Sequence, residues 1–398
     1  MPAARSRFAV IFFTVLIDLI GFGIIIPILP YYAQRLGAGG LGLGALLGVF
    51  SAMQFLATAF LGRTSDRVGR RPILLATMLI NAAGYVLFAS AHSYAVLFVA
   101  RVVSGFAGGN ISAAQAYMAD ITTPAERSRG MGLIGAAFGL GFIIGPALGG
   151  LSAHYLGRAA PGLVAAALSL ANFVSAYLIL PESLGAEHRT ERPLWDFSHI
   201  GDAFKDPRLA PLMLAWAIAP FAFSGYTVAI PLWAALMFGW REQQLGWFFT
   251  VIGITAAIVQ GYAFGKLARR FGDRALLIVG GFGMAVAIAI VPALQSSAAL
   301  YGWTALLALS NSIFGPAATG LVSIFADPTE QGTVLGAAQA LGALGRLLGP
   351  LVLGKVYDLA HPAAFLVAGT VMALGGVVCL RVPKQLDAQT HRRTAVIS

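Results

Sequence analysis

The chain consists of long apolar runs that are interrupted by short polar segments. A helix that spans a bilayer needs about 20 mostly apolar residues. Six predicted spans lie in the first half and six in the second, near residues 8–32, 41–62, 72–90, 94–117, 130–152, 160–180, 209–234, 244–265, 275–294, 298–322, 332–354 and 362–381. Because backbone groups in lipid must bond internally, we expect all spans of this length to be helices. The sequence therefore predicts an all-α membrane protein with twelve transmembrane helices.

The composition agrees with a membrane protein. Hydrophobic residues make up 58% of the chain and charged residues 11%, whereas soluble domains carry about 25% charged residues. The net charge of +10 does not indicate a nucleic-acid-binding protein, because the basic residues fall in short clusters between apolar runs. The single cysteine, Cys379, excludes an internal disulfide, and the sequence contains no Cys/His cluster of the kind that binds a metal.

The distribution of Lys and Arg predicts the orientation in the membrane. If the N-terminus is cytoplasmic, 20 of the 26 basic residues fall in segments on the cytoplasmic side and only four on the opposite side. This bias follows the positive-inside rule. We therefore expect a multi-pass membrane protein with both termini in the cytoplasm.

The two halves of the chain resemble each other. The stretch LGRTSDRVGRRPILL at 61–75 recurs as FGKLARRFGDRALLI at 264–278, and Gly145-Pro146 recurs as Gly349-Pro350. Two six-helix bundles of parallel topology are the expected source of such repetition. We expect the bundles at 1–180 and 209–398, the second with a short cytoplasmic tail, and a cytoplasmic linker at 181–208. Apolar residues of the linker either form a short interfacial helix or belong to a solvated segment; they are Leu194, Trp195, Phe197, Ile200 and Phe204.

The loop between the second and third spans carries a specific pattern, Gly62-Arg-Thr-Ser-Asp66-Arg-Val-Gly69-Arg70-Arg71-Pro72. Gly62 permits close helix approach, while Gly69 and Pro72 suit a tight turn into the next helix. Asp66 suits a helix N-terminus, and the arginines suit carboxylate partners. A simple basic anchor would not require an acid and two glycines at fixed places.

The fifth span carries a cluster of small residues, Gly135, Gly139, Gly141, Gly145-Pro146 and Gly149-Gly150. Glycines at this spacing let two helices touch backbone to backbone. A proline inside a helix removes one hydrogen bond and can bend it. Ordinary packing of small residues is the alternative interpretation.

Ionisable residues inside the predicted spans are few. Asp18 is the one acid of 16 that lies deep within a span, and all six histidines fall in loops or tails. A charged, unpaired carboxylate is costly in the membrane, so Asp18 is the candidate proton carrier; a hydrogen-bonded structural acid is the alternative. At 1.5 Å per residue, Asp18 and Arg101 of the fourth span both lie near the midplane. An interaction between them that depends on protonation is therefore expected.

The signature loop, the glycine-proline cluster and the stretch Arg101-Val-Val-Ser-Gly105-Phe-Ala-Gly108-Gly109 together resemble the major facilitator superfamily. The closest resemblance is to its drug/proton antiporter branch, which includes the tetracycline efflux proteins. The resemblance implies that Arg101 takes part in proton coupling with Asp18. It further implies that Gly141, Gly145, Pro146 and Gly149 form the motif typical of exporters. The loop residues that would latch the outward-facing state are Gly62, Asp66, Arg67, Gly69, Arg70 and Arg71, with Asp120 and Glu126 as acidic partners.

The chain also departs from tetracycline exporters. It has Gly84 and Ala285 where those proteins carry acids in the third and ninth spans, and Ala257 aligns with their eighth-span histidine. Those polar groups are tied to the transport of a drug–metal complex. The resemblance therefore does not identify tetracycline as the substrate.

Aromatic and amide side chains within the spans are candidates for the wall of a substrate cavity, although each is also explained by helix packing or interhelical hydrogen bonds. They are Phe22, Tyr31, Tyr85, Tyr117, Phe221, Tyr226, Trp233, Gln54, Asn81, Asn110, Gln115, Gln260 and Asn311. Arg346, in the eleventh span, has no acidic partner within the spans of the second half. A carbonyl cluster, Asp18, water or an anionic group of the substrate would compensate its charge, and a purely structural role is an equal alternative.

The sequence thus predicts a proton-coupled antiporter that exports a drug-like or small amphipathic metabolite by alternating access. Its expected partners are a small-molecule substrate, protons and membrane lipid. We expect a monomer that is not an enzyme, binds no nucleic acid, and needs no cofactor besides the proton as coupling ion. A proton-linked or facilitative importer of a sugar or organic acid is the alternative, which the glycine-proline cluster disfavours. A sensor or lipid-handling protein is a third possibility, but no added receptor domain is visible. The absence of a P-loop pattern argues against ATP as the energy source.

Overall fold

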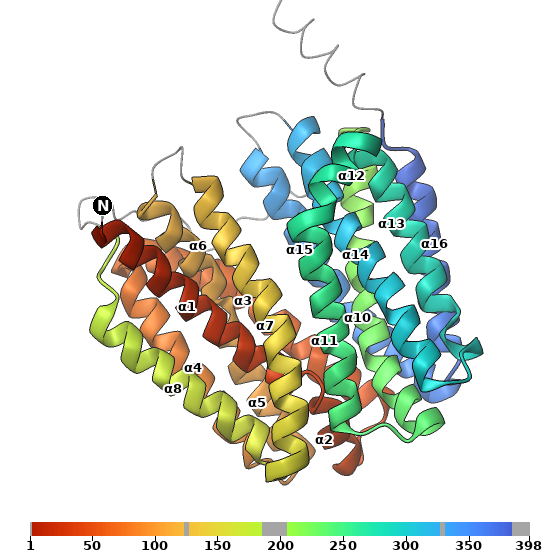
Figure 1. Cartoon of the computed structure of the whole chain (residues 1–398), viewed down its shortest axis with the longest axis horizontal. Helices are drawn as coiled ribbons and strands as arrows, with labels where there is room; N and C mark the ends of the chain where they lie inside the picture. Colours follow the sequence, from red (N-terminus) through yellow and green to blue (C-terminus); the bar gives the residue numbers. More distant parts are fainter. Residues whose placement is uncertain (1, 123–126, 185–204, 327–330, 384–398) are drawn as a thin grey trace, which may run out of the picture. The chain divides into compact units, whose positions relative to one another are not determined.

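The computed structural model of the 398-residue chain describes residues 2–122, 127–184, 205–326 and 331–383. In these ranges the regular elements are all helices (Figure 1). The first part contains α1 (Pro2–Ile25), α2 (Leu29–Arg35), α3 (Gly40–Val68), α4 (Arg70–Ala89), α5 (Tyr94–Ala107), η1 (Gly108–Asn110), α6 (Ile111–Asp120), α7 (Arg127–Leu156) and α8 (Ala160–Ile179). The second part contains α10 (Ala210–Phe238), α11 (Glu242–Ile258), η3 (Val259–Ala263), α12 (Phe264–Phe271), α13 (Asp273–Ala289), η4 (Val291–Ala293), α14 (Ser297–Phe325), α15 (Gln331–Leu359) and α16 (Ala363–Leu380).

The helices have the length and apolar character of membrane spans. Within the described ranges, eleven helical stretches are long and apolar enough to cross a bilayer. The remaining predicted span corresponds to α13, which has 17 residues and is slightly shorter than the others. The all-α membrane fold predicted from the hydropathy pattern is confirmed.

The chain divides into two compact units. Unit 1 runs from the N-terminus through α8 and also includes Ala234–Ile254, which covers the end of α10 and most of α11. Unit 2 contains the first part of α10 and everything from Thr255 onward. The linker residues 185–204, which include the possible interfacial helix, lie outside the described residues.

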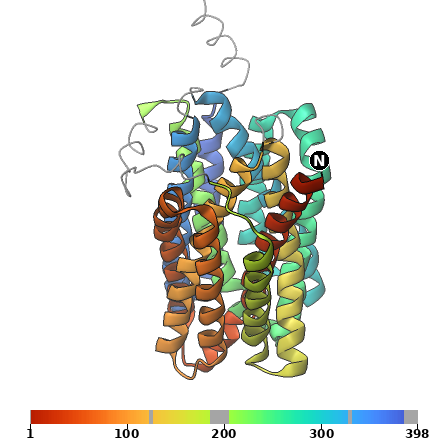
Figure 2. The same ribbon diagram turned by 90° about the vertical axis from the view of Figure 1, so that its left-hand side faces the viewer.

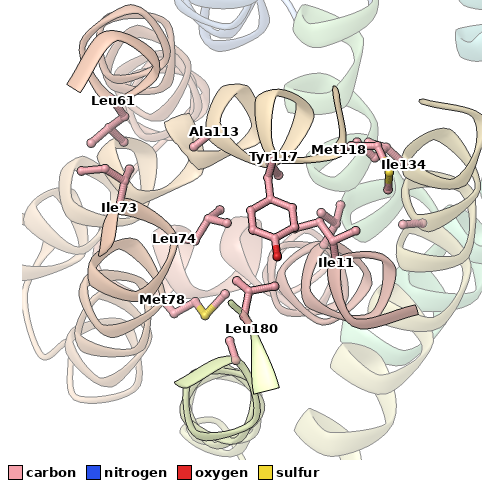
Figure 3. Packing of buried hydrophobic residues seen from close by; sticks show 14 of the residues in the cluster. Ile11, Leu61, Ile73, Leu74, Met78, Ala113, Tyr117, Met118, Ile134 and Leu180 are labelled. Atoms are coloured by element: carbon pink, nitrogen blue, oxygen red, sulfur yellow. The ribbon is translucent and has the colours of Figure 1, made fainter. Parts of the chain in front are cut away.

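Unit 1 is organised around α1, which packs against α7 and α8, while α4 packs against α5 and α8. Figure 2 shows these helices from the side, with α7 and α8 running next to each other. One apolar cluster joins them, and Tyr117 of α6 is at its centre (Figure 3). The Tyr117 ring lies among Ile11, Leu74 and Leu180, and its hydroxyl donates a hydrogen bond of 3.0 Å to the carbonyl of Pro181. This side chain therefore belongs to the packed core, which agrees with helix packing, the alternative given for this candidate cavity residue.

The internal repeat seen in the sequence is also a repeat of contacts. Arg71 donates from Nη2 to the carbonyl of Tyr177 at the end of α8, over 2.7 Å. Arg274 donates from Nη2 to the carbonyl of Leu380 at the end of α16, over 2.8 Å. The donor and the acceptor of the second contact each lie 203 positions after those of the first contact. Hence the third and sixth helices of each half are tied together by equivalent arginines.

The two repeated loops also turn in the same way. Gly69, between α3 and α4, has φ of 110°, and Gly272, between α12 and α13, has φ of 78°. These left-handed backbone conformations favour glycine because it lacks a Cβ atom. The glycines of the repeated motif are therefore required by the turn into the next helix.

A small polar contact precedes α10. Asp206 accepts a hydrogen bond of 2.8 Å from the backbone nitrogen of Arg208 and forms an ion pair of 2.7 Å with its guanidinium. Partial burial alone would raise the pKa of Asp206, but the hydrogen bonds and charge of Arg208 outweigh it, so the pKa lies below its ordinary value. The carboxylate therefore stays charged at neutral pH and holds the chain at the entry to the helix.

Candidate functional site

Asp18 lies in the second half of α1 and is held by two amide side chains. Asn110 of η1 donates from Nδ2 to Oδ2 of Asp18 over 2.6 Å. Asn172 of α8 donates from Nδ2 to Oδ1 of Asp18 over 3.3 Å and to the carbonyl of Thr14 over 2.9 Å. Both partners are neutral donors. Hence each oxygen of the carboxyl group is engaged, while no cation of the described chain forms an ion pair with it.

Tyr85 of α4 completes this side of the Asp18 site. A methyl group placed on Gly21, one turn after Asp18, would lie 3.0 Å from the Tyr85 hydroxyl. The glycine therefore leaves room for the phenol next to α1. Tyr85 is buried, as is Asn81 one turn before it on the same helix. The Tyr85 hydroxyl of α4 thus lies close to the face of α1 that carries Asp18.

Arg101 of α5 is buried but does not contact Asp18. Its Nε donates a long hydrogen bond of 3.5 Å to the carbonyl of Leu46, and its guanidinium lies 4.2 Å from the centre of the Phe50 ring. Phe50 in turn stacks on Phe22, with 5.2 Å between ring centres. Phe22 is one helical turn after Asp18. In this structure the stacked rings of Phe50 and Phe22 therefore lie between Arg101 and α1, and the interaction with Asp18 that depends on protonation stays a prediction.

The glycine cluster of α7 packs against α1 next to Asp18. A Cβ atom on Gly141 would lie 2.6 Å from Cβ of Leu19, and one on Gly145 would lie 2.6 Å from Cα of Gly23. Both distances are far below a normal contact, so larger residues do not fit. Gly149 meets the backbone of Ile24 in the same way. The three glycines thus bring α7 into backbone contact with α1 over more than two turns.

The other side of α7 receives the first part of α11 in unit 1. A Cβ atom on Gly246 would lie 2.7 Å from the carbonyl of Pro146, and Thr250 donates a hydrogen bond of 3.3 Å to the carbonyl of Ile143. At the start of α11, Glu242 forms an ion pair of 3.2 Å with Arg35 of α2. No sequence motif indicates this pair, because its two residues are 207 positions apart in the chain.

The signature loop forms a polar cluster around Arg70. The guanidinium of Arg70 pairs with Asp66 and with Asp120, and Nε lies 3.1 Å from Oδ2 of Asp120. Nη1 also donates to the hydroxyl of Ser65 over 2.7 Å. Arg70 is buried, whereas Asp66 and Asp120 are more accessible to solvent. Gly62, the first residue of the loop, lies against Ser112 of α6. The remaining acid expected to pair with the loop, Glu126, lies outside the described residues.

Glu182 is a member of this cluster that the sequence did not reveal. Its carboxylate accepts hydrogen bonds of 2.9 Å and 3.2 Å from the backbone nitrogens of Arg70 and Arg71 at the start of α4. A Cβ atom on Gly69 would collide with it. Glu182 therefore occupies the helix N-terminus that we had expected Asp66 to face, and Asp66 instead binds the Arg70 side chain.

In unit 1, some candidate cavity residues are hydrogen-bonded between helices and others are at least partly accessible. Asn110 binds Asp18, and Gln54 donates to the carbonyl of Gly108 over 3.2 Å, so both amides are engaged between helices. Phe22 is partly buried, and Gln115 is exposed. Hence only some of these residues are free to meet a ligand.

In unit 2 the candidate cavity residues differ in how deeply they are buried. Tyr226 and Trp233 of α10 are buried against Phe365, at 6.1 Å and 5.7 Å between ring centres, which favours a packing role. Gln260 is exposed and lies in η3, a π-helical turn. Asn311 and Arg346 are partly buried. These last two are accessible polar groups inside long apolar helices.

Comparison with known proteins places the chain in a family. The sequence profile of the Major Facilitator Superfamily matches residues 11–241 and 212–395. The class C tetracycline resistance protein of Escherichia coli is 32% identical over 89% of this chain and 90% of its own length. Multidrug resistance protein 2 of Bacillus subtilis (strain 168) is 29% identical over 96% and 97% of the two chains.

A solved structure agrees with these matches. The crystal structure of the human organic anion transporter MFSD10 (TETRAN) is 27% identical, covers 95% of this chain and 100% of its own, and has a TM-score of 0.71. The relatives are membrane transporters and not enzymes, so this chain is a multi-pass transporter as well. Together, the matched profile, the helical fold and the relatives show that the chain belongs to the major facilitator superfamily, with the tetracycline and multidrug resistance proteins among its relatives.

Proposed function

We propose that this transporter is a proton-coupled antiporter of the bacterial inner membrane that exports a drug-like or small amphipathic compound. In this proposal the protein acts as a monomer with both termini in the cytoplasm. Protonation of Asp18 and occupancy by substrate alternate during the cycle. The two six-helix bundles, at 1–180 and 209–398, would move as the opposing halves.

The observation that carries the proposal is the environment of Asp18. Its carboxyl group is bound by the amides of Asn110 and Asn172 rather than by an arginine. An ion pair would favour the charged form strongly, whereas neutral donors leave a carboxyl able to gain and lose a proton. A titratable acid within a membrane helix is a functional candidate by default. Asp18 is thus suited to carry the coupling proton.

The contact between α1 and α7 supports export with coupling. Gly141 and Gly145 bring the exporter-type motif directly against the residues that follow Asp18 in α1. A change in the bend of α7 at Pro146 would therefore act on the helix that carries the proton site. The names of the relatives, which include tetracycline and multidrug resistance proteins, agree with export of a small organic compound.

A screen in living cells tests this function and its direction. An efflux-deficient bacterium that expresses the chain is grown against a panel of antibiotics, dyes and organic acids. We expect raised resistance to at least one compound and lower cellular accumulation of it in energised cells. If the expressing cells accumulate more of the compound than cells that lack the transporter, the result would instead favour a proton-linked importer.

A further inference from the structure

Arg346 is a cation inside unit 2 that has no hydrogen-bond or ion-pair partner among the residues of this unit that the structure describes. It lies near the middle of α15, about 20 Å along the helix axis from either end. In the described residues of unit 2, 205–233, 255–326 and 331–383, no acid pairs with its guanidinium and no carbonyl accepts a hydrogen bond from it. A charge in the interior of a membrane protein is costly unless it is paired. This guanidinium therefore has unused capacity to bind an anion.

A second unused donor lies beside Arg346. The indole nitrogen Nε1 of Trp216, in α10, is buried and donates no hydrogen bond within the described chain. A methyl group placed on Gly342 would lie 3.4 Å from Nη1 of Arg346 and 3.4 Å from Cε3 of Trp216. The guanidinium and the indole thus lie against the same point of α15, and the missing side chain at Gly342 leaves room next to both.

The internal repeat shows that helix packing does not require this cation. Gly349 of α15 lies against the backbone of Phe221 in α10, as Gly145 of α7 lies against α1. In this register Arg346 corresponds to Phe142, whose ring packs on Phe22 at 5.9 Å between centres. An aromatic residue therefore suffices at this position of the bundle. The substitution of a cation for an apolar ring points to a ligand.

We infer that Arg346 and Trp216 bind the acidic group of an amphipathic organic anion, which is the substrate class of the proposed exporter and rests on that proposal. A guanidinium binds a carboxylate or sulfonate through two parallel N–H bonds. The indole N–H supplies a further donor, and its ring offers a flat apolar surface to the rest of the molecule. The phosphate of an anionic lipid carries similar chemistry, so the test must separate the two sources.

The test uses the purified full-length protein in detergent and three matched probes. They are 1-naphthaleneacetate, its neutral amide, and the cation 1-naphthylmethylammonium, with binding measured by calorimetric titration. We expect the acid to bind at least about tenfold more tightly than the amide, and the cation to bind most weakly. Arg346→Gln should lower affinity for the acid about tenfold or more and leave the amide nearly unchanged. Trp216→Phe keeps an aromatic ring but removes the N–H donor, and it should lower the affinity for the acid about threefold to tenfold.

Matched variants keep the result interpretable. Lys355→Gln removes an exposed cation from the same helix and should leave all three affinities unchanged. Arg346→Lys keeps the charge and should retain part of the affinity for the acid. All variants are compared at equal monodispersity in gel filtration, so that a folding defect is recognised separately.

Several outcomes would overturn the inference. They are equal affinity of the wild-type protein for acid and amide, equal loss of all probes in Arg346→Gln, or a site that responds to phosphatidylglycerol and not to the naphthalene acid. Binding in detergent needs no proton gradient. A protein that binds the acid through Arg346 but moves no protons would therefore refute the coupling mechanism and leave the anion site standing.

Discussion

The side chain of Asn110 donates a hydrogen bond from Nδ2 to Oδ2 of Asp18, with 2.6 Å between the two atoms. The contact joins η1 to α1 and involves residues 92 positions apart. A neutral donor stabilises a carboxylate less than an arginine would, but it still favours the charged form. Asn110 is therefore expected to set the pH at which Asp18 exchanges its proton.

Removal of this donor should shift the pH dependence of transport. In Asn110→Leu the charged form of Asp18 loses its shorter hydrogen bond, and a bond to a charged group contributes about 1.5–3 kcal/mol. The pH midpoint of substrate-induced proton release should move toward alkaline values by roughly one unit. Proton release is followed with a pH dye in lightly buffered detergent solution.

A control separates this effect from a loss of stability. Ser169→Ala removes a buried hydrogen bond of 2.9 Å between α8 and the carbonyl of Met78. It should destabilise the protein by about 1 kcal/mol without a change in the pH midpoint. The role assigned to Asn110 would be untenable if both variants had the wild-type midpoint.

Close packing of α7 on α1 should be needed for export. In Gly145→Leu the new Cβ atom alone would lie 2.6 Å from Cα of Gly23, so the helices must separate. Overpacking of this kind costs about 1–3 kcal/mol and would displace the helix that carries Asp18. We expect protein in the membrane but efflux reduced at least about tenfold.

Gly135→Leu is the matched control, because no described residue lies within 4 Å of a Cβ atom at that position of the same helix. It should export normally. Wild-type efflux by Gly145→Leu would refute the argument from close packing.

The signature loop should select between conformational states, as proposed for a latch. Asp66→Asn removes one of two carboxylates that pair with the buried Arg70. Removing one partner of a shielded ion pair leaves the charge of the remaining partner, here Arg70, less compensated. We expect the outward-facing state to become less populated.

The readout is the labelling rate of single cysteines introduced on the periplasmic side, in a background without Cys379. Labelling should slow about threefold or more in Asp66→Asn. Thr64→Val, whose hydroxyl bonds only within α3, should label like the parent protein. Unchanged labelling in a well-folded Asp66→Asn protein would exclude the latch role.

The sequence predicted what depends on local pattern. Apolar runs of membrane length define the spans whatever their neighbours are, and the repeated loops predicted turns that glycine at 69 and 272 makes possible. A pairing of the loop arginines with Asp120 was also expected from the family resemblance, and Arg70 makes it.

Contacts between distant helices were harder to predict. Asn172 binds Asp18, and Glu182 binds the start of α4. Each residue is more than 100 positions away from its partner in the chain, and neither stands in a recognisable motif. The stack of Phe22 and Phe50, which separates Arg101 from α1, depends on how α3 is placed. For Tyr117 the sequence left a cavity wall and helix packing as alternatives, and only the structure shows that its hydroxyl donates to a backbone carbonyl in the core.

The most direct test of the account is substrate-induced proton release by Asp18→Asn. The amide keeps the shape of the carboxyl group but cannot lose a proton near neutral pH. Purified wild-type protein should release protons when it binds a substrate found in the growth screen, and Asp358→Asn, an exposed acid on α15, should do the same. Asp18→Asn should bind the substrate, release no protons and fail to drive uphill efflux in vesicles with an imposed pH gradient. Proton release or uphill transport by Asp18→Asn at the wild-type level would show that another group carries the proton.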